Sequence, residues 1–378
     1  FRDDGWGTKL IYPFGNGSQS QAMGLDVLAG VDRTWEILEN VNVGVDAAFL
    51  DSRLGFSFDY FVKMNNNMLI PVTYPSMLGA EAPYSNSGKL RTNGFELTLN
   101  WTDKIGNVEY SAQFQLTDAV NKLVEYGGAD TYKLGLNETR EGYPMNSYFA
   151  YVYDGVIKDQ ADLDAYKKLE GVPSNIGIGD AKFKDLNGDG KVTAEDQTII
   201  GHGLPIHTGG FTNNFEWKGF DLSVFFQWSY GNDVINYNRT RLESLNSKHT
   251  NQLVSAANHW TPRTVNPDGS ITEGNYTNYL CAPNRSLTNI NTDREIEDAS
   301  FLRLKNVQLG YSFPTKMLKN LKIRSLRVYV SAQNIWTWTK YTGYDPEVST
   351  RNSAMTRGFD YSSYPRTRSY TFGVKLGL

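Results

Sequence analysis

The strongest constraint on this chain is a set of segments in which apolar and polar residues alternate strictly. In 305–313, Val307, Leu309, Tyr311 and Phe313 alternate with Asn306, Gln308, Gly310 and Ser312. Because successive side chains of a strand point to opposite faces, this segment predicts a strand that is apolar on one face and polar on the other. The pattern returns in 326–333, after a short connection, and in 369–378, after a long polar loop.

Eight more strands are expected upstream, at 39–49, 53–62, 95–101, 108–116, 132–140, 149–153, 207–217 and 219–230. The strand at 132–140 alternates least clearly and is expected mainly because up-and-down parity requires one there, whereas Phe149, Tyr151 and Tyr153 alternate well enough to predict a strand. Short turns alternate with long loops, of which 158–206 and 231–300 are the longest. This rhythm is typical of an up-and-down outer-membrane β-barrel with short periplasmic turns. A soluble sandwich is the competing interpretation, but its connections are usually short at both ends.

Composition agrees with a membrane crossing made by strands. Aromatic residues make up 13% of the chain, and no window approaches the roughly 18 to 20 consecutive apolar residues of a membrane helix. The net charge of -4 gives no support for nucleic-acid binding, which favours a basic face. A single cysteine, Cys281, excludes an internal disulfide framework and is best interpreted as a loop thiol.

One loop segment has the layout of a calcium site. Within 185–196, oxygen-bearing side chains occupy positions 1, 3, 5, 9 and 12, position 7 can supply a backbone carbonyl, and glycine occupies position 6, as in an EF-hand or dockerin loop. The predicted Ca²⁺ ligands are Asp185, Asn187, Asp189, Lys191 (through its carbonyl), Thr193 and Asp196. Aspartate in place of glutamate at the last position should weaken binding. The alternative is a turn-rich loop whose side chains cap their own backbone.

The sequence offers no arrangement that indicates an enzyme. The four histidines lack metal-binding spacing, and no Ser-His-Asp, Cys-His or phosphate-binding pattern is present. Aromatic residues of the loops are better candidates for binding, because their rings can stack on sugars. The candidates are Trp260, Tyr276, Tyr279, Tyr341 and Tyr344. For Trp260 and Tyr279, packing inside the loop is an equal alternative, and Trp336 and Trp338 fit an aromatic girdle at the lipid headgroups better.

Several motifs, taken together and in order, resemble the SusC/RagA family of TonB-dependent outer-membrane transporters. They are WEILENVNVGVDAAFL at 35–50, TNGFELTL at 92–99, EGYP at 141–144, FKDLNGDGKV at 183–192, LRLKNVQLGYSF at 302–313 and RVYVSAQNI at 327–335. The resemblance covers nearly the whole chain. It implies an all-β, transmembrane antiparallel barrel of which this chain supplies about 11 of 22 strands, with the N-terminal plug absent from this sequence.

The resemblance also implies a function. It points to TonB-dependent import of a glycan or oligopeptide across a Gram-negative outer membrane, with a SusD-like surface lipoprotein as a lid and the TonB complex acting through the missing N-terminal part. Polar residues such as Glu96, Glu109, Gln113, Asn306 and Gln308 would line the lumen. A passive porin-like channel and a secreted carbohydrate-binding β-protein with a dockerin-like calcium loop remain the alternatives.

Sidedness follows from the loop lengths. With the C-terminus periplasmic, 158–206 and 231–300 are extracellular, and the 313–324 turn faces the periplasm. Tyr311 and Phe313 should then form the inner girdle and Trp336 and Trp338 the outer one. Val307, Leu309, Val328 and Val330 are expected to face outer-membrane lipid.

Overall fold

A computed structural model provides the structure of this chain. It describes residues 6–13, 19–25, 33–71, 84–127, 131–134, 137–245, 249–275, 280–283, 292–321, 323–350 and 356–378. The chain divides into two compact units: the first comprises Phe1–Thr102, Gln113–Leu134 and Glu138–Met145, and the second comprises Asp103–Ala112, Gly135–Asn137 and Asn146–Leu378. Among the described residues, no helix is both long and apolar enough to cross a membrane.

The first unit is built on long antiparallel strands. Its part of the large sheet has the order β3 (Ile37–Phe49), β4 (Leu54–Pro71), β5 (Tyr84–Ile105) and β6 (Val108–Tyr126), and β5 and β6 continue into the second unit. Val43 pairs with Tyr60, and Val45 with Phe58, so the apolar residues of neighbouring strands share a face as the alternation predicts. The shorter strands are β1 (Trp6–Pro13), β2 (Gln19–Leu25), β7 (Thr131–Leu134) and β8 (Asn137–Arg140).

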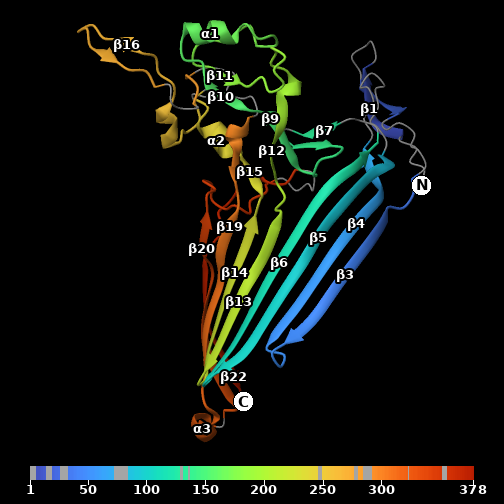
Figure 1. Ribbon diagram of the computed structural model, residues 1–378, viewed down its shortest axis with the longest axis vertical. Helices are drawn as coiled ribbons and strands as arrows, with labels where there is room; N and C mark the ends of the chain where they lie inside the picture. Colours follow the sequence, from blue (N-terminus) through green and yellow to red (C-terminus); the bar gives the residue numbers. More distant parts are fainter. Residues whose placement is uncertain are drawn as a thin grey trace. The chain divides into compact units, whose positions relative to one another are not determined.

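The second unit carries the rest of the large sheet, in the order β6, β13, β14, β19, β20 and β22 (Figure 1). The bounds are β13 His207–Trp217, β14 Phe220–Tyr230, β19 Phe301–Ser312, β20 Ser325–Thr339 and β22 Ser369–Gly377. A two-residue turn joins β13 to β14, with Lys218 at φ 47° and Gly219 at φ 90°. Two consecutive positive φ values give the twist that a tight hairpin needs, and a Cβ on Gly219 would lie 2.7 Å from the Ser312 carbonyl oxygen.

The two faces of this sheet differ sharply in chemistry. Strand pairing places Leu222, Leu309, Val330 and Phe372 in one row, and Ser223, Gln308, Ser331 and Thr371 in the neighbouring row on the opposite side. We call these sides the apolar face and the polar face. Large side chains of the apolar face are exposed, among them Leu309, Val328, Phe372, Val374 and Leu376. An extended apolar surface of this kind needs a nonaqueous neighbour.

Aromatic side chains mark both ends of the apolar face. At the turn end, rings contact one another in the series Trp217, Phe220, Tyr311 and Phe313, with centroid separations of 6.4, 4.5 and 4.9 Å. At the other end, Trp336 and Trp338 are half exposed on β20. This is the placement expected for two aromatic girdles.

Smaller elements of the second unit lie at the loop end of the strands, while α3 (Thr315–Leu318) lies at the turn end (Figure 1). The loop elements are β9 Ser147–Tyr151, β10 Tyr153–Val156, α1 Gln160–Tyr166, β11 Ala181–Phe183, β12 Gln197–His202, β15 Asp233–Asn236, α2 Tyr237–Leu242, β16 Thr264–Val265, β17 Ile271–Thr272, β18 Ile296–Asp298 and β21 Phe359–Asp360. β15 pairs with both β18 and β21, which joins the 231–300 loop to the 340–368 loop.

The β9–β13 connection contains a hydrophobic core of its own. Its buried members are Ile157, Leu163, Tyr166, Ile176, Ala181, Phe183 and Val192, together with Cys281 from the next long loop. Ala282 N–H donates to the Gly179 carbonyl at 2.8 Å, which fixes the two loops to each other. These connections are therefore folded structures rather than open loops.

Nine of the eleven expected strands lie in the large sheet, and two predictions about its membership were wrong. The segment 132–140 forms the short β7 and β8 outside it, and 149–153 forms β9, which pairs with β12. Alternation indicates that a segment is a strand but does not say which sheet it joins. Removing two strands leaves the parity, and so the predicted sidedness, unchanged.

Candidate functional site

The polar face of the second unit is the candidate functional surface. Its central rows carry no charge: Ser223, Gln308, Ser331 and Thr371 form one row, and in the next row Asn306 lies between Gln333 and the aromatic Phe225. Asn214 of β13 donates to the Ser111 hydroxyl at 3.3 Å, which extends this chemistry to β6. Such a surface can exchange hydrogen bonds with water, sugars or peptide groups without binding a charge tightly.

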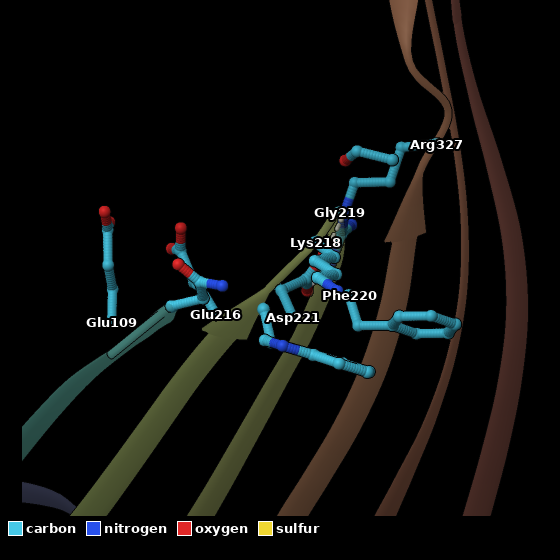
Figure 2. A pocket seen from close by; sticks show the side chains of 10 residues that line it. Glu109, Glu216, Lys218, Gly219, Phe220, Asp221 and Arg327 are labelled. Atoms are coloured by element: carbon cyan, nitrogen blue, oxygen red, sulfur yellow. Dashed lines mark hydrogen bonds and ion pairs between the residues drawn. The ribbon is translucent and has the colours of Figure 1, made fainter. Parts of the chain in front are cut away.

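Charged groups gather at the turn end of this face, in a cavity of about 540 Å³ (Figure 2). Arg327 of β20 binds both carboxylate oxygens of Asp221 of β14, with Nε 3.0 Å from Oδ1. A Cβ on Gly310 would lie 2.5 Å from both groups, so glycine leaves the space for the pair. Glu109 and Glu216 line the same cavity. Of the predicted lumen residues, Glu109 thus belongs to a charged rim, and Asn306 and Gln308 to the neutral rows.

The other predicted lumen residues lie in the first unit. Glu96 is on β5, where it pairs across the sheet with Asp59 of β4, and Gln113 is on β6. Both belong to strands of the large sheet, and their place in a lumen stays a prediction.

A second charged cluster lies at the loop end of the polar face. Arg303 of β19 is 1% exposed, and its guanidinium donates to Asp345 at 2.9 Å, to Glu347 at 2.5 Å and to the Thr337 hydroxyl at 2.9 Å. Arg366 approaches the same two carboxylates, at 3.2 Å from Asp345 and 3.0 Å from Glu347. Arg303 therefore attaches the 340–368 loop to the polar face through two carboxylates, and Arg366, from the same loop, pairs with both of them.

The segment leading into this cluster is anchored by a partly buried carboxylate. Glu297 of β18 accepts from Thr342 N–H at 2.8 Å, from the Thr342 hydroxyl at 2.9 Å and from Arg239 of α2 at 3.0 Å. Although burial opposes ionisation, these hydrogen bonds hold the pKa of Glu297 below its ordinary value. Glu297 is thus a charged anchor that joins β18, α2 and the 340–368 loop, and we call this contact the loop junction.

The pKa of Glu295, two residues earlier, is shifted in the opposite direction. Glu295 is 4% exposed, and burial raises its pKa to about 7, with Arg294 and Arg239 only partly offsetting that effect. Because Arg239 acts on both Glu295 and Glu297, we include Glu295 in the loop junction, which therefore contains a carboxyl group that changes charge near neutral pH.

The calcium-type loop lies on the core of the β9–β13 connection. Asp185 accepts from Gly188 and Gly190 N–H at 2.7 and 2.8 Å, and Asp189 accepts from Lys191 N–H at 2.9 Å. Asp196, which is buried, accepts from Leu186 and Thr193 N–H groups at 2.9 and 2.8 Å. The remaining predicted ligand side chains, Asn187 and Thr193, accept from Asp189 N–H at 3.0 Å and from Glu195 N–H at 3.3 Å.

These contacts fit the alternative in which the side chains cap their own backbone. In the part of the chain that the structure describes, no three His, Cys, Asp or Glu side chains form a group that could hold a metal ion. Each carboxylate oxygen keeps a further lone pair, so Ca²⁺ at this loop stays a prediction.

The structure separates the aromatic candidates. Trp260 packs beside Gly179, where an added Cβ would lie 3.3 Å from the indole, and Tyr341 is 5% exposed with its hydroxyl bonded to Asp360. Both serve loop packing in this arrangement. Tyr344, in contrast, is 75% exposed, whereas Tyr276 and Tyr279 lie outside the described residues. Tyr344 is the described candidate whose ring is accessible to a ligand.

Comparison with known proteins gives a consistent result. The family model for TonB-dependent receptor-like β-barrels matches residues 17–335. TonB-dependent receptor P3 of Formosa agariphila is 31% identical over 97% of this chain and 36% of the relative, and SusC of Bacteroides thetaiotaomicron is 25% identical over 90% of this chain and 32% of the relative. The solved structure of the RagAB peptide transporter superposes with a TM-score of 0.75 at 25% identity, over 97% of this chain and 38% of that one. The chain spans about a third of the length of these curated relatives.

Proposed function

Because the chain belongs to the TonB-dependent receptor-like β-barrel family, we propose that it forms part of a transporter that imports a glycan or an oligopeptide across the outer membrane of a Gram-negative bacterium. The observation that carries this proposal is the contrast between the two faces of the second unit's sheet. An exposed apolar face with aromatic ends suits lipid, and a neutral hydrogen-bonding face suits a polar cargo and the water around it.

Import of this kind needs partners on both sides of the membrane. We expect a SusD-like surface lipoprotein at the loop end and the TonB complex at the turn end, the latter acting through a plug domain of the whole receptor. The two-component name of the RagAB peptide transporter, with which this chain shares its fold, supports the first partner. The folded loops of the second unit offer a surface on which such a partner can rest.

Deleting the gene for the whole receptor in its source organism tests the function directly. Growth on a panel of oligosaccharides and oligopeptides should be lost for one class of cargo and restored when the gene is returned. Uptake should also stop when a protonophore collapses the proton gradient that energises TonB. Uptake that survives the protonophore would indicate a passive channel, and a receptor recovered from the medium without detergent would indicate a secreted binding protein.

Ca²⁺ at the 185–196 loop is part of the proposal, with the ion making the loop rigid rather than taking part in transport. Terbium luminescence of the purified receptor, competed by Ca²⁺, measures the site. Asp185→Asn should weaken binding at least about tenfold, because it removes a charged ligand. Asp268→Asn is the matched control, since Asp268 caps its own turn through Ser270 in a loop without the calcium-type spacing. Absence of binding at millimolar Ca²⁺ would contradict this part.

A further inference from the structure

We propose that Arg303 is a positioning residue that fixes the Thr342–Glu347 segment to the polar face and thereby presents the ring of Tyr344 to the cargo. This inference rests on the proposed import function, and it assigns roles to Arg303, Asp345 and Glu347 in it. We call the contact between these three side chains the Arg303 clamp.

The first step of the argument is the geometry of the clamp. All three guanidinium nitrogens of Arg303 donate to acceptors, namely Thr337 on the neighbouring strand and the two carboxylates of the loop. The guanidinium carbon Cζ also lies 4.9 Å from the centroid of the Phe301 ring. An arginine that is buried and engaged on every side has one orientation, so its loop partners are held in one place.

The second step is that the segment is held at its other end too. Glu297 binds both the backbone N–H and the hydroxyl of Thr342. Gly343 follows, and a Cβ there would lie 2.4 Å from the Tyr341 hydroxyl, so the buried Tyr341 ring packs directly against this backbone. The backbone around residue 344 is therefore fixed from both sides, by anchors at Thr342 and Asp345.

The third step concerns Tyr344 itself. It lies between the two anchors, at Thr342 and Asp345, yet its side chain is 75% exposed. A rigid backbone with an exposed aromatic ring is a preorganised contact, because the ring loses little conformational freedom when a sugar or peptide stacks on it. The neutral rows of the polar face begin on the same strands that hold the clamp, β19 and β20. A cargo that stacks on Tyr344 would thus meet hydroxyl and amide groups next.

Spin labelling tests the positioning without any cargo. In a Cys281→Ala background of the whole receptor, Tyr344→Cys carries a nitroxide whose line shape reports backbone mobility. We expect the spectrum of this label to be dominated by a slow-motion component. Arg303→Gln should convert most of that component to a fast-motion one. Glu347→Gln, which leaves Asp345 in place, should convert only part of it. A label at Val265→Cys, in the separate β16–β17 hairpin, should not respond. Equal mobility at residue 344 with and without the clamp would overturn the proposal, and Glu347→Gln decides it if Arg303→Gln does not assemble.

Uptake tests the cargo contact. The probes are fluorescein-labelled maltodextrin and a fluorescein-labelled tryptic digest of casein, given to cells that express the whole receptor. Tyr344→Ala should raise the half-saturating concentration about three- to tenfold and leave the maximal rate unchanged. Tyr364 lies in the same loop and is 86% exposed, so Tyr364→Ala is the control. It should change neither the half-saturating concentration nor the maximal rate.

The double variant connects the two roles. If Arg303 acts through Tyr344, Arg303→Gln should add nothing once the ring is removed, so the double variant should behave like Tyr344→Ala alone, whereas independent effects would multiply. Multiplying effects, or a Tyr344→Ala variant that behaves like Tyr364→Ala, would refute the proposal. A wild-type receptor that imports neither probe would count against the proposed function, and the spin-label comparison would still decide the positioning.

Discussion

The loop junction should weaken as the pH rises through neutrality, because Glu295 must then ionise while buried. Burial raises the pKa of Glu295 from its ordinary value of 4.5 to about 7. The closed junction therefore retains a proton that the opened junction releases. The contribution of Glu295 to the stability of the closed junction is complete below about pH 4.5 and is lost as the pH rises through about 7. The difference between the two pKa values corresponds to about 3 kcal/mol at higher pH.

Hydrogen exchange of the whole receptor in detergent measures this effect. The amides of Thr342, bound to Glu297, and of Ala299, bound to the Asn232 carbonyl, report opening of the junction. After correction for the intrinsic effect of pH on exchange, their protection should fall about a hundredfold between pH 5 and pH 8. Glu295→Gln carries no charge at either pH and should abolish that change.

The control is Glu273→Gln, which alters an exposed carboxylate in the 231–300 loop that pairs with Arg263. It should leave the pH dependence of both amides intact. Protection that is equal at pH 5 and pH 8 in the unmodified receptor would refute the reasoning. A pH dependence that persists in Glu295→Gln would assign it to another group.

Three further predictions concern the thermal stability of the assembled barrel. Samples are heated to a series of temperatures before electrophoresis, and the transition temperature is the one at which the compact folded form is lost. Arg303→Gln removes one partner of a buried ion cluster and should cost about 3 to 5 kcal/mol, with a clearly lower transition temperature. Asp221→Asn weakens a pair that is only partly buried, so its effect should be about 1 kcal/mol and should shrink in high salt. Gly219→Val meets both an unfavourable φ and the Ser312 carbonyl, and it should destabilise more than Gly269→Val, where φ is 80° but no atom lies within 4 Å.

Much of the strand framework could be predicted because alternation and turn chemistry act locally. The β13–β14 hairpin was expected at 207–217 and 219–230, and the strands are found at His207–Trp217 and Phe220–Tyr230. The strands β5 and β6 were expected to be far shorter than their 22 and 19 residues. Their extensions pass through segments such as 84–94 and 117–126, where alternation fades although backbone pairing continues.

The charged clusters could not be predicted in the same way. In the sequence, Arg303 is not distinguished from the other polar residues on the polar face of its strand. Its partners Asp345 and Glu347 are 42 and 44 residues away. Only the pairing of β19 with β20 and the path of the following loop bring them together. The sequence does hold one signal, since Asp345 and Glu347 flank a proline, but nothing in the spacing indicates that a strand arginine binds them.

The core beneath the β9–β13 connection affects how such receptors can exchange specificity. Cys281 and Ala282, from the 231–300 loop, complete the packing and hydrogen bonding of a structure otherwise formed by residues 151–192. A recombination event that imported one loop from a relative would leave an unfilled core and an unpaired Gly179 carbonyl. The two loops therefore share one core and have to be exchanged together. Chimaeric receptors should assemble only when both loops come from the same donor.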